Sequence, residues 1–173
     1  SILAGVRNRY VKEMEGEEIS DDLLPGFELI KNWNLRADSL NTSAALSILT
    51  LPNAFKLENL KYDRDSITIK LRENMSYLKK QYGRIDVPLG RVFRLVRGET
   101  SLPLSGGPGT LRAIYSKKSG KNYKAVAGDC YIQAVEWGPE GQLNAWSIHQ
   151  YGSSTMDKTS PHFDDQSKSF SKH

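Results

Sequence analysis

The sequence has few of the residues that disulfide frameworks, metal cages and membrane spans require. Its 173 residues include one cysteine, Cys130, and three histidines. A single cysteine excludes an internal disulfide and a zinc cage built from thiolates. No stretch approaches the run of about 18 apolar residues that a transmembrane helix needs. Residues 1–7 lack the apolar region and cleavage site of a signal peptide.

Positive charge is concentrated in the middle of the chain. Residues 61–124 carry 15 basic and five acidic side chains, whereas residues 1–22 carry three basic and six acidic ones. The basic region has two interpretations. It is either a binding site for an anionic partner, as in a non-enzymatic binding module, or an ordinary surface that is solvated or packs on an acidic patch elsewhere in the same protein. The second interpretation is favoured, because few aromatic residues are interleaved with the basic ones as on nucleic-acid-binding surfaces. We therefore expect neither nucleic acid nor a membrane as partner.

The first half of the chain has the spacing of amphipathic helices. Apolar residues recur at steps of three and four from Ile2 to Met14, and Gly16 follows as a breaker. A second helix is predicted after residues 20–22, which offer an N-cap, with Pro25 in its first turn.

Two further helices are predicted before residue 84. One covers 44–51, with Thr42 or Ser43 as its cap, and the other follows residues 65–66 and ends at Gly83. The apolar side of the last helix is formed by Ile67, Ile69, Leu71, Met75, Leu78 and Tyr82.

Strand patterns dominate the second half. Period-two alternation over 130–137 and 143–151, joined by the turn signal at 138–141, predicts a β-hairpin. A short apolar run at 92–96 is also strand-like, and the polar tail holds one predicted helix from Pro161. Helices followed by strands are typical of the α+β class.

We interpret residues 1–173 as a single segment, mostly helical over 1–83, β-rich over 84–152 and polar over 153–173. One hairpin and two further strands are too few to form a self-sufficient sheet. This shortage indicates that the segment belongs to a larger chain.

The glycine cluster at 105–110 invites comparison with a phosphate-binding loop. Such a loop needs a lysine and a helix N-terminus directly after the glycines. Here Pro108 lacks an N–H group, and Leu111 and Arg112 follow instead. We predict a tight turn.

The histidines offer little support for a metal or catalytic site. His162 lies near Asp165, but the further ligands that a metal needs are not visible, so we predict that this pair bonds to the backbone and holds the tail. His149 is expected to be a partly exposed strand residue, and His173 is terminal. Serines are plentiful enough for a serine–histidine–carboxylate triad, but no Gly-x-Ser-x-Gly elbow occurs. We predict no metal site and no cofactor site here.

Ser1 is the alternative catalytic residue. An N-terminal serine can act as nucleophile with its own α-amino group as base. That chemistry requires a serine at the start of a buried strand, whereas Ser1 begins a helical pattern. The favoured prediction is that residues 1–173 contain no catalytic residue.

Five ordered blocks resemble those of a known family. They lie at 29–38 with 43–45, at 82–90, at 106–113, at 128–131, and at 151–154 with 160–166. The first block is similar to a Leu-x-x-Trp-Asp…Asp…Ser-x-Ala helix pair, and the last to a Gly-Gln-Ser-Gly…Ser-x-His-Tyr-x-Asp-Gln motif. In this order they resemble the C-terminal part of the β chain of the penicillin acylase family, N-terminal-nucleophile hydrolases that include the acyl-homoserine lactone acylases.

Four positions depart from the family pattern. Asn34 replaces the usual Asp, Leu89 a common Trp, Ser153 the Gln, and Thr155 the second Gly. These departures indicate a divergent member.

The resemblance implies an αββα fold and an amidohydrolase made as a precursor that cleaves itself. The β chain would begin with the nucleophilic serine, and the oxyanion-hole Asn and the calcium ligands would also lie upstream of this segment. The implied partners are the α chain, the N-terminal part of the β chain and a small N-acyl substrate. The family is typically periplasmic or secreted and includes enzymes of antibiotic metabolism.

Overall fold

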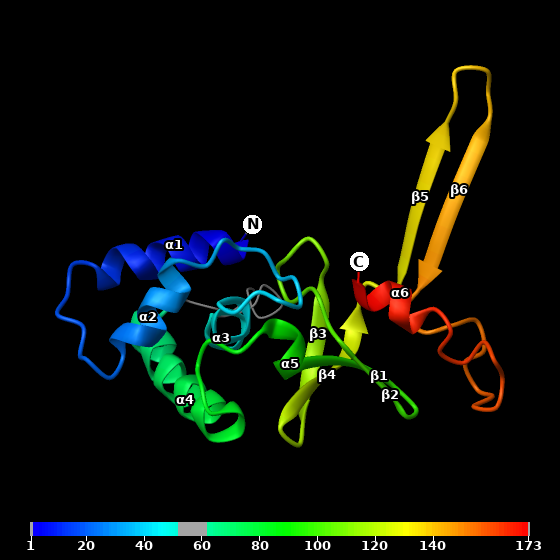
Figure 1. Cartoon of the computed structure of the whole chain (residues 1–173). Helices are drawn as coiled ribbons and strands as arrows, with labels where there is room; N and C mark the ends of the chain where they lie inside the picture. Colours follow the sequence, from blue (N-terminus) through cyan, green and yellow to red (C-terminus); the bar gives the residue numbers. More distant parts are fainter. Residues whose placement is uncertain (1, 52–61, 173) are drawn as a thin grey trace.

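The computed structural model describes residues 2–51 and 62–172. Helices come first and strands follow, so the predicted α+β class is confirmed. In Figure 1 the first helices gather at one end, a sheet lies beside them, and a long hairpin projects away from both. The αββα layering implied by the resemblance stays a prediction.

The helical half contains α1 (Ile2–Met14), α2 (Leu24–Lys31), α3 (Ala44–Thr50) and α4 (Arg64–Tyr82). Each corresponds to one of the helices predicted from apolar spacing. Their apolar faces meet in one core that includes the fully buried ring of Trp33.

One residue of α4 contradicts its predicted apolar face. Ile67, Leu71, Met75 and Leu78 are buried, but Ile69 is 56% exposed. Two helical residues span a rotation of about 200°, so Ile69 lies opposite Ile67. Apolar character alone did not identify the buried face.

The predicted cap of α2 was wrong, while Ser43 is the N-cap residue of α3 as predicted but forms no capping side-chain hydrogen bond. Leu23 occupies the N-cap of α2 without a capping side chain, and Ser20 contributes only its carbonyl, which accepts from Leu24 N–H at 3.1 Å. At α3 the carboxamide of Asn41 accepts from the N–H groups of Ser43 and Ala44, at 3.0 and 3.1 Å. The path of the incoming loop decides which side chain reaches the free N–H groups.

Helix α4 begins slightly earlier than predicted. Asp63 is its N-cap, and its carboxylate accepts from Asp65 N–H at 3.1 Å. The helix ends at Gly83, as predicted, where a left-handed backbone with φ of 77° suits a residue without Cβ.

A four-stranded sheet follows α4 and the short helix α5 (Leu89–Val92). Its strands are β1 (Phe93–Arg97), β2 (Thr100–Pro103), β3 (Ile114–Ser119) and β4 (Asn122–Gly128), in the order β2-β1-β4-β3. Strand β1 pairs parallel with β4, and the other pairs are antiparallel.

The sequence-based expectation of only two strands besides the hairpin was wrong. Strands β3 and β4 are rich in lysine, serine and alanine, and have few of the β-branched residues that signal a strand. Their pairing depends on contact with β1 and on the tight turn at Gly120, not on their own composition.

The predicted hairpin is confirmed as β5 (Tyr131–Trp137) and β6 (Leu143–His149). It projects from the molecule in Figure 1. Most residues of both strands are exposed on both faces, including Trp137 at 73% and Trp146 at 58%.

The tail ends in α6 (Ser167–Lys172), later than the predicted start at Pro161. Residues 161–166 form turns, and Phe170 of α6 is fully buried in the core. Among the helices of residues 2–51 and 62–172, none combines the length and the hydropathy needed to cross a bilayer.

Candidate functional site

Three of the sequence blocks meet on the loop between α2 and α3. The carbonyls of Ser39 and Asn41 accept from the N–H groups of Gly90 at 2.8 Å and Leu89 at 3.0 Å. The carbonyl of Ala37 accepts from Gly106 N–H at 2.6 Å. Segments about 50 to 70 residues apart are therefore fixed to one another by backbone hydrogen bonds.

A cavity of about 610 Å³ lies beside this loop. Its walls include Arg36, Asp38, Arg112, Asp129 and Lys172, together with apolar side chains. None of the described residues lining it is a histidine or a cysteine.

Arg112 forms one wall of this cavity and is partly buried. Its guanidinium stacks 4.1 Å from the ring centre of Phe170, and Nη2 donates to the Phe170 carbonyl. Burial lowers the pKa of Arg112, and the charge of Asp129 opposes that effect. Arg112 thus attaches α6 to the wall of the cavity.

Two of the three glycine N–H groups in the cluster at 105–110 are already hydrogen-bonded. Gly106 N–H donates to Ala37, and Gly107 N–H contacts both the carbonyl of Arg112 and the hydroxyl of Thr110 at 3.0 Å. Phosphate would have to displace these bonds, so the geometry is that of a structural turn.

The histidines do not gather into a site. His162 Nδ1 lies 2.8 Å from the carboxylate of Asp165. The ring therefore bonds to a side chain, whereas the sequence had led us to expect a bond to the backbone. His149 lies in β6 beside the Tyr131 ring, while His173 and Ser1 fall outside the described residues. Within residues 2–51 and 62–172, no three His, Cys, Asp or Glu residues are placed to hold a metal ion.

Arg97 also holds the tail, and sequence reasoning missed this role. Its guanidinium lies 4.0 Å from the ring centre of Phe163 and 4.9 Å from that of Tyr151. Nη2 donates to the Thr155 carbonyl at 2.7 Å. The only available signal was an arginine shortly after the second block together with two aromatic residues in the fifth.

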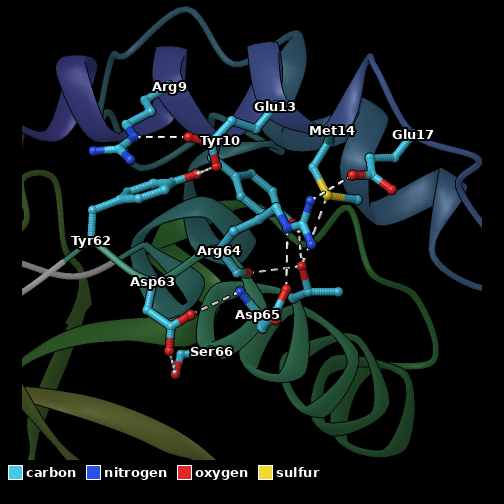
Figure 2. Close-up of polar contacts among 11 residues, drawn as sticks. Arg9, Tyr10, Glu13, Met14, Glu17, Tyr62, Asp63, Arg64, Asp65 and Ser66 are labelled. Atoms are coloured by element: carbon cyan, nitrogen blue, oxygen red, sulfur yellow. Dashed lines mark hydrogen bonds and ion pairs between the residues drawn. The ribbon is translucent and has the colours of Figure 1, made fainter.

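The densest polar network joins α1 to the start of α4 (Figure 2). Glu13 pairs with Arg9 at 2.9 Å and accepts from the Tyr62 hydroxyl at 2.8 Å, and Arg9 stacks on the Tyr62 ring. Arg64 pairs with Glu17 at 2.7 Å. The network fastens two helices together across the edge of the core.

The pKa shifts in this network oppose catalysis by its tyrosines. Burial, followed by the hydrogen bond to Glu13, raises the pKa of Tyr62, and burial also raises the pKa of Tyr10. The hydrogen bond from Arg9 lowers the pKa of Glu13. Near neutral pH both phenols stay protonated, so neither is a nucleophile or a base.

Removing the hydroxyl of Tyr10 is expected to have a small effect. The Tyr10 ring is buried against Phe27, and its hydroxyl lies 3.1 Å from that of Thr68. Tyr10→Phe keeps the ring and is expected to cost about 1 kcal/mol in urea unfolding. A loss above about 3 kcal/mol would show that the hydroxyl has a larger role.

Comparison with known proteins identifies the family. The sequence model described as penicillin amidase matches residues 2–173. The chain belongs to the penicillin amidase family. No curated protein matches the chain significantly.

Membership of the penicillin amidase family supports an acylase-like, hydrolytic parent protein. The described residues form a packed core, a loop on which three of the sequence blocks meet, and a C-terminal tail that is bonded to the rest of the chain. They include no hydroxyl or thiol hydrogen-bonded to a histidine ring.

The structure explains why the penicillin amidase pattern tolerates Asn34. The side-chain oxygen of Asn34 accepts from Arg36 N–H at 3.0 Å and from Asn41 Nδ2 at 2.8 Å. Both bonds require only an acceptor, which the usual aspartate also supplies.

Asn34→Asp is therefore expected to change the free energy of unfolding by less than about 1 kcal/mol, whereas Asn34→Leu should cost about 1–3 kcal/mol. Urea unfolding of both variants measures the difference. Equal losses would contradict the assignment of an acceptor role to this position.

Proposed function

We propose that this chain is the C-terminal structural part of an acylase that hydrolyses an amide bond through an N-terminal serine lying upstream of it. The family match over residues 2–173 and the order of the five blocks support this proposal. The chain would supply the helices and strands that support a site built by the preceding part of the precursor.

The exposed hairpin is the observation that carries the structural role. Trp137 and Leu143 are 73% and 61% exposed on one face, and Trp146 is largely exposed on the other. An isolated hairpin is only marginally stable, and each large apolar side chain gains about 1.5–3 kcal/mol on burial. Both faces therefore require a cover, and the rest of the precursor is the proposed cover.

In the proposed reaction the serine hydroxyl attacks the amide carbonyl while the serine α-amine takes its proton. The acyl group is transferred to the serine oxygen and the amine leaves with a proton, after which water releases the acid. The residues described here take no part in these steps. By the family resemblance, the calcium ligands of the parent protein would lie upstream of this segment.

The remaining proposals concern processing, location and use. Self-cleavage of the precursor would create the nucleophile, and the parent would act in the periplasm or outside the cell on small N-acyl compounds, including antibiotics. The family resemblance supports each of these proposals.

Intact mass and N-terminal sequencing of the natural protein test the proposal. We expect two chains, with residues 1–173 inside the larger one and serine as its first residue. Replacing that first serine with alanine should abolish amidase activity, while Ser1→Ala in this segment should leave it unchanged. A mature active chain that begins at Ser1 would overturn the proposal.

A further inference from the structure

Three cations lie side by side across the four-stranded sheet. Arg94 of β1 is the register partner of Lys124 in β4, and Lys124 is the partner of Lys117 in β3. Register partners project from the same face with neighbouring Cβ atoms about 5 Å apart. We name these three residues the cation row.

No carboxylate neutralises the cation row. None of its members forms an ion pair within the part of the chain that the structure describes. Between residues 87 and 128 the sequence contains one acidic residue, Glu99, at the turn between β1 and β2. Arg94 donates to the carbonyls of Gly90 at 2.9 Å and Ser101 at 2.6 Å, whereas neither lysine ammonium has a hydrogen-bond partner among the described residues. Like charges opposite each other destabilise a sheet, so the two lysines are unfavourably placed without a partner.

Two aromatic side chains of this sheet lie on its inner face. Phe93 and Tyr123, the sequence neighbours of Arg94 and Lys124, stack with ring centres 5.2 Å apart, and Tyr77 of α4 packs against Tyr123. These rings are turned toward the helices, so they are not available to stack on the bases of a nucleic acid. Val126 follows Lys124 by two residues, at the point where the register of β3 and β4 shifts, and is 54% exposed.

The sheet holds the cation row in a fixed position. The hydroxyls of Tyr77 and Tyr82 both donate to the carbonyl of Lys121, at the turn between β3 and β4. Asn122 Nδ2 donates to the Arg91 carbonyl at 3.1 Å. A surface ordered in this way binds a partner with less loss of conformational entropy.

We propose that the outer face of this sheet, centred on the cation row, docks an acidic polypeptide segment of the preceding part of the same precursor. Carboxylates would neutralise the row, and the exposed Val126 favours a folded polypeptide over a hydrated polyanion. Strand β4 leads into the uncovered hairpin after only Asp129 and Cys130, so one partner can cover both surfaces. This inference rests on the proposed function.

Carbodiimide coupling in the full two-chain protein tests the proposal, because it joins lysine amines directly to adjacent carboxylates. Mass spectrometry is expected to find Lys117 and Lys124 coupled to Asp or Glu outside residues 1–173. Lys79 and Lys80, exposed on α4 and without an ion pair among the described residues, are the matched controls and should not couple to that segment.

Charge reversal gives a second readout. In the two-chain protein, Lys117→Glu with Lys124→Glu is expected to lower the midpoint of urea unfolding, and high salt should weaken the original contact as well. Lys79→Glu with Lys80→Glu makes the same change in charge and is expected to have little effect.

Three results would overturn the docking proposal. One is acetylation of Lys117 and Lys124 as fast as that of Lys79 and Lys80, with no coupling to other segments. Another is salt-sensitive binding of duplex DNA or anionic vesicles that the charge reversal abolishes. The third is a natural protein without any preceding part.

Failure of the docking can be told from failure of the proposed function. Two chains with amidase activity but no coupling would reject the docking and leave the proposed function intact, whereas coupling without amidase activity would reject the function and keep the docking.

Discussion

Gly90→Ala is expected to destabilise the protein by about 2–3 kcal/mol, while Gly5→Ala is expected to stabilise it by about 0.5–1 kcal/mol. A Cβ at position 90 would lie 2.6 Å from the Cβ of Pro103 and 2.8 Å from that of Ser39. Both of these atoms are attached directly to the backbone, so they cannot move aside as the end of a flexible side chain can.

Gly5 is the matched control for this substitution. It lies in α1, where an added Cβ would meet nothing within 4 Å and would raise helix propensity. Urea unfolding of both variants gives the comparison. Changes of the same sign in the free energy of unfolding would show that the close approach of Ser39, Gly90 and Pro103 does not determine the effect of Gly90→Ala.

Polar substitutions on either face of the hairpin are expected to disrupt assembly with the rest of the protein. Trp137→Ser with Leu143→Ser alters one face, and Ile132→Ser with Trp146→Ser alters the other. Each pair removes roughly 3 kcal/mol or more of burial, which corresponds to a loss of about 100-fold or more in association. Co-purification of the two chains and amidase activity measure the loss.

Leu40→Ser is the control for these variants. Leu40 is 80% exposed in the loop between α2 and α3, outside the hairpin. It is expected to leave assembly unchanged. If one hairpin face tolerates its substitutions and the other does not, the hairpin is covered on one side only, and the two-sided cover proposed above is wrong.

The parts of the fold predicted from sequence are those with a strong local repeat. Helix α4 shows apolar residues at steps of three and four, and the hairpin shows alternation on either side of its Gly-Pro-Glu-Gly turn. Strands β3 and β4 escaped prediction because lysine and alanine dilute their alternation. Their identity as strands comes from pairing, of β4 with β1 and of β3 with β4.

For the candidate sites, too, local features could be predicted from the sequence and long-range contacts could not. The block order indicated the family, and the lack of a Gly-x-Ser-x-Gly elbow argued against a nucleophile in this segment. The role of Arg97 between Tyr151 and Phe163 was not visible, because these residues are more than 50 positions apart. The cation row was visible only as a basic region, since its alignment depends on strand register.

The sequence by itself determined the α+β class, the four helical segments of the first half, the hairpin and the family. Each of these depends on residue types within a few positions, or on the order of blocks along the chain. Only the tertiary structure decided that Ala37, Gly90 and Gly106 meet at one loop, that Ile69 faces outward, and that the hairpin is exposed on both faces. These features depend on which distant surfaces pack together, and packing is set by the shape of the whole core and not by any local pattern.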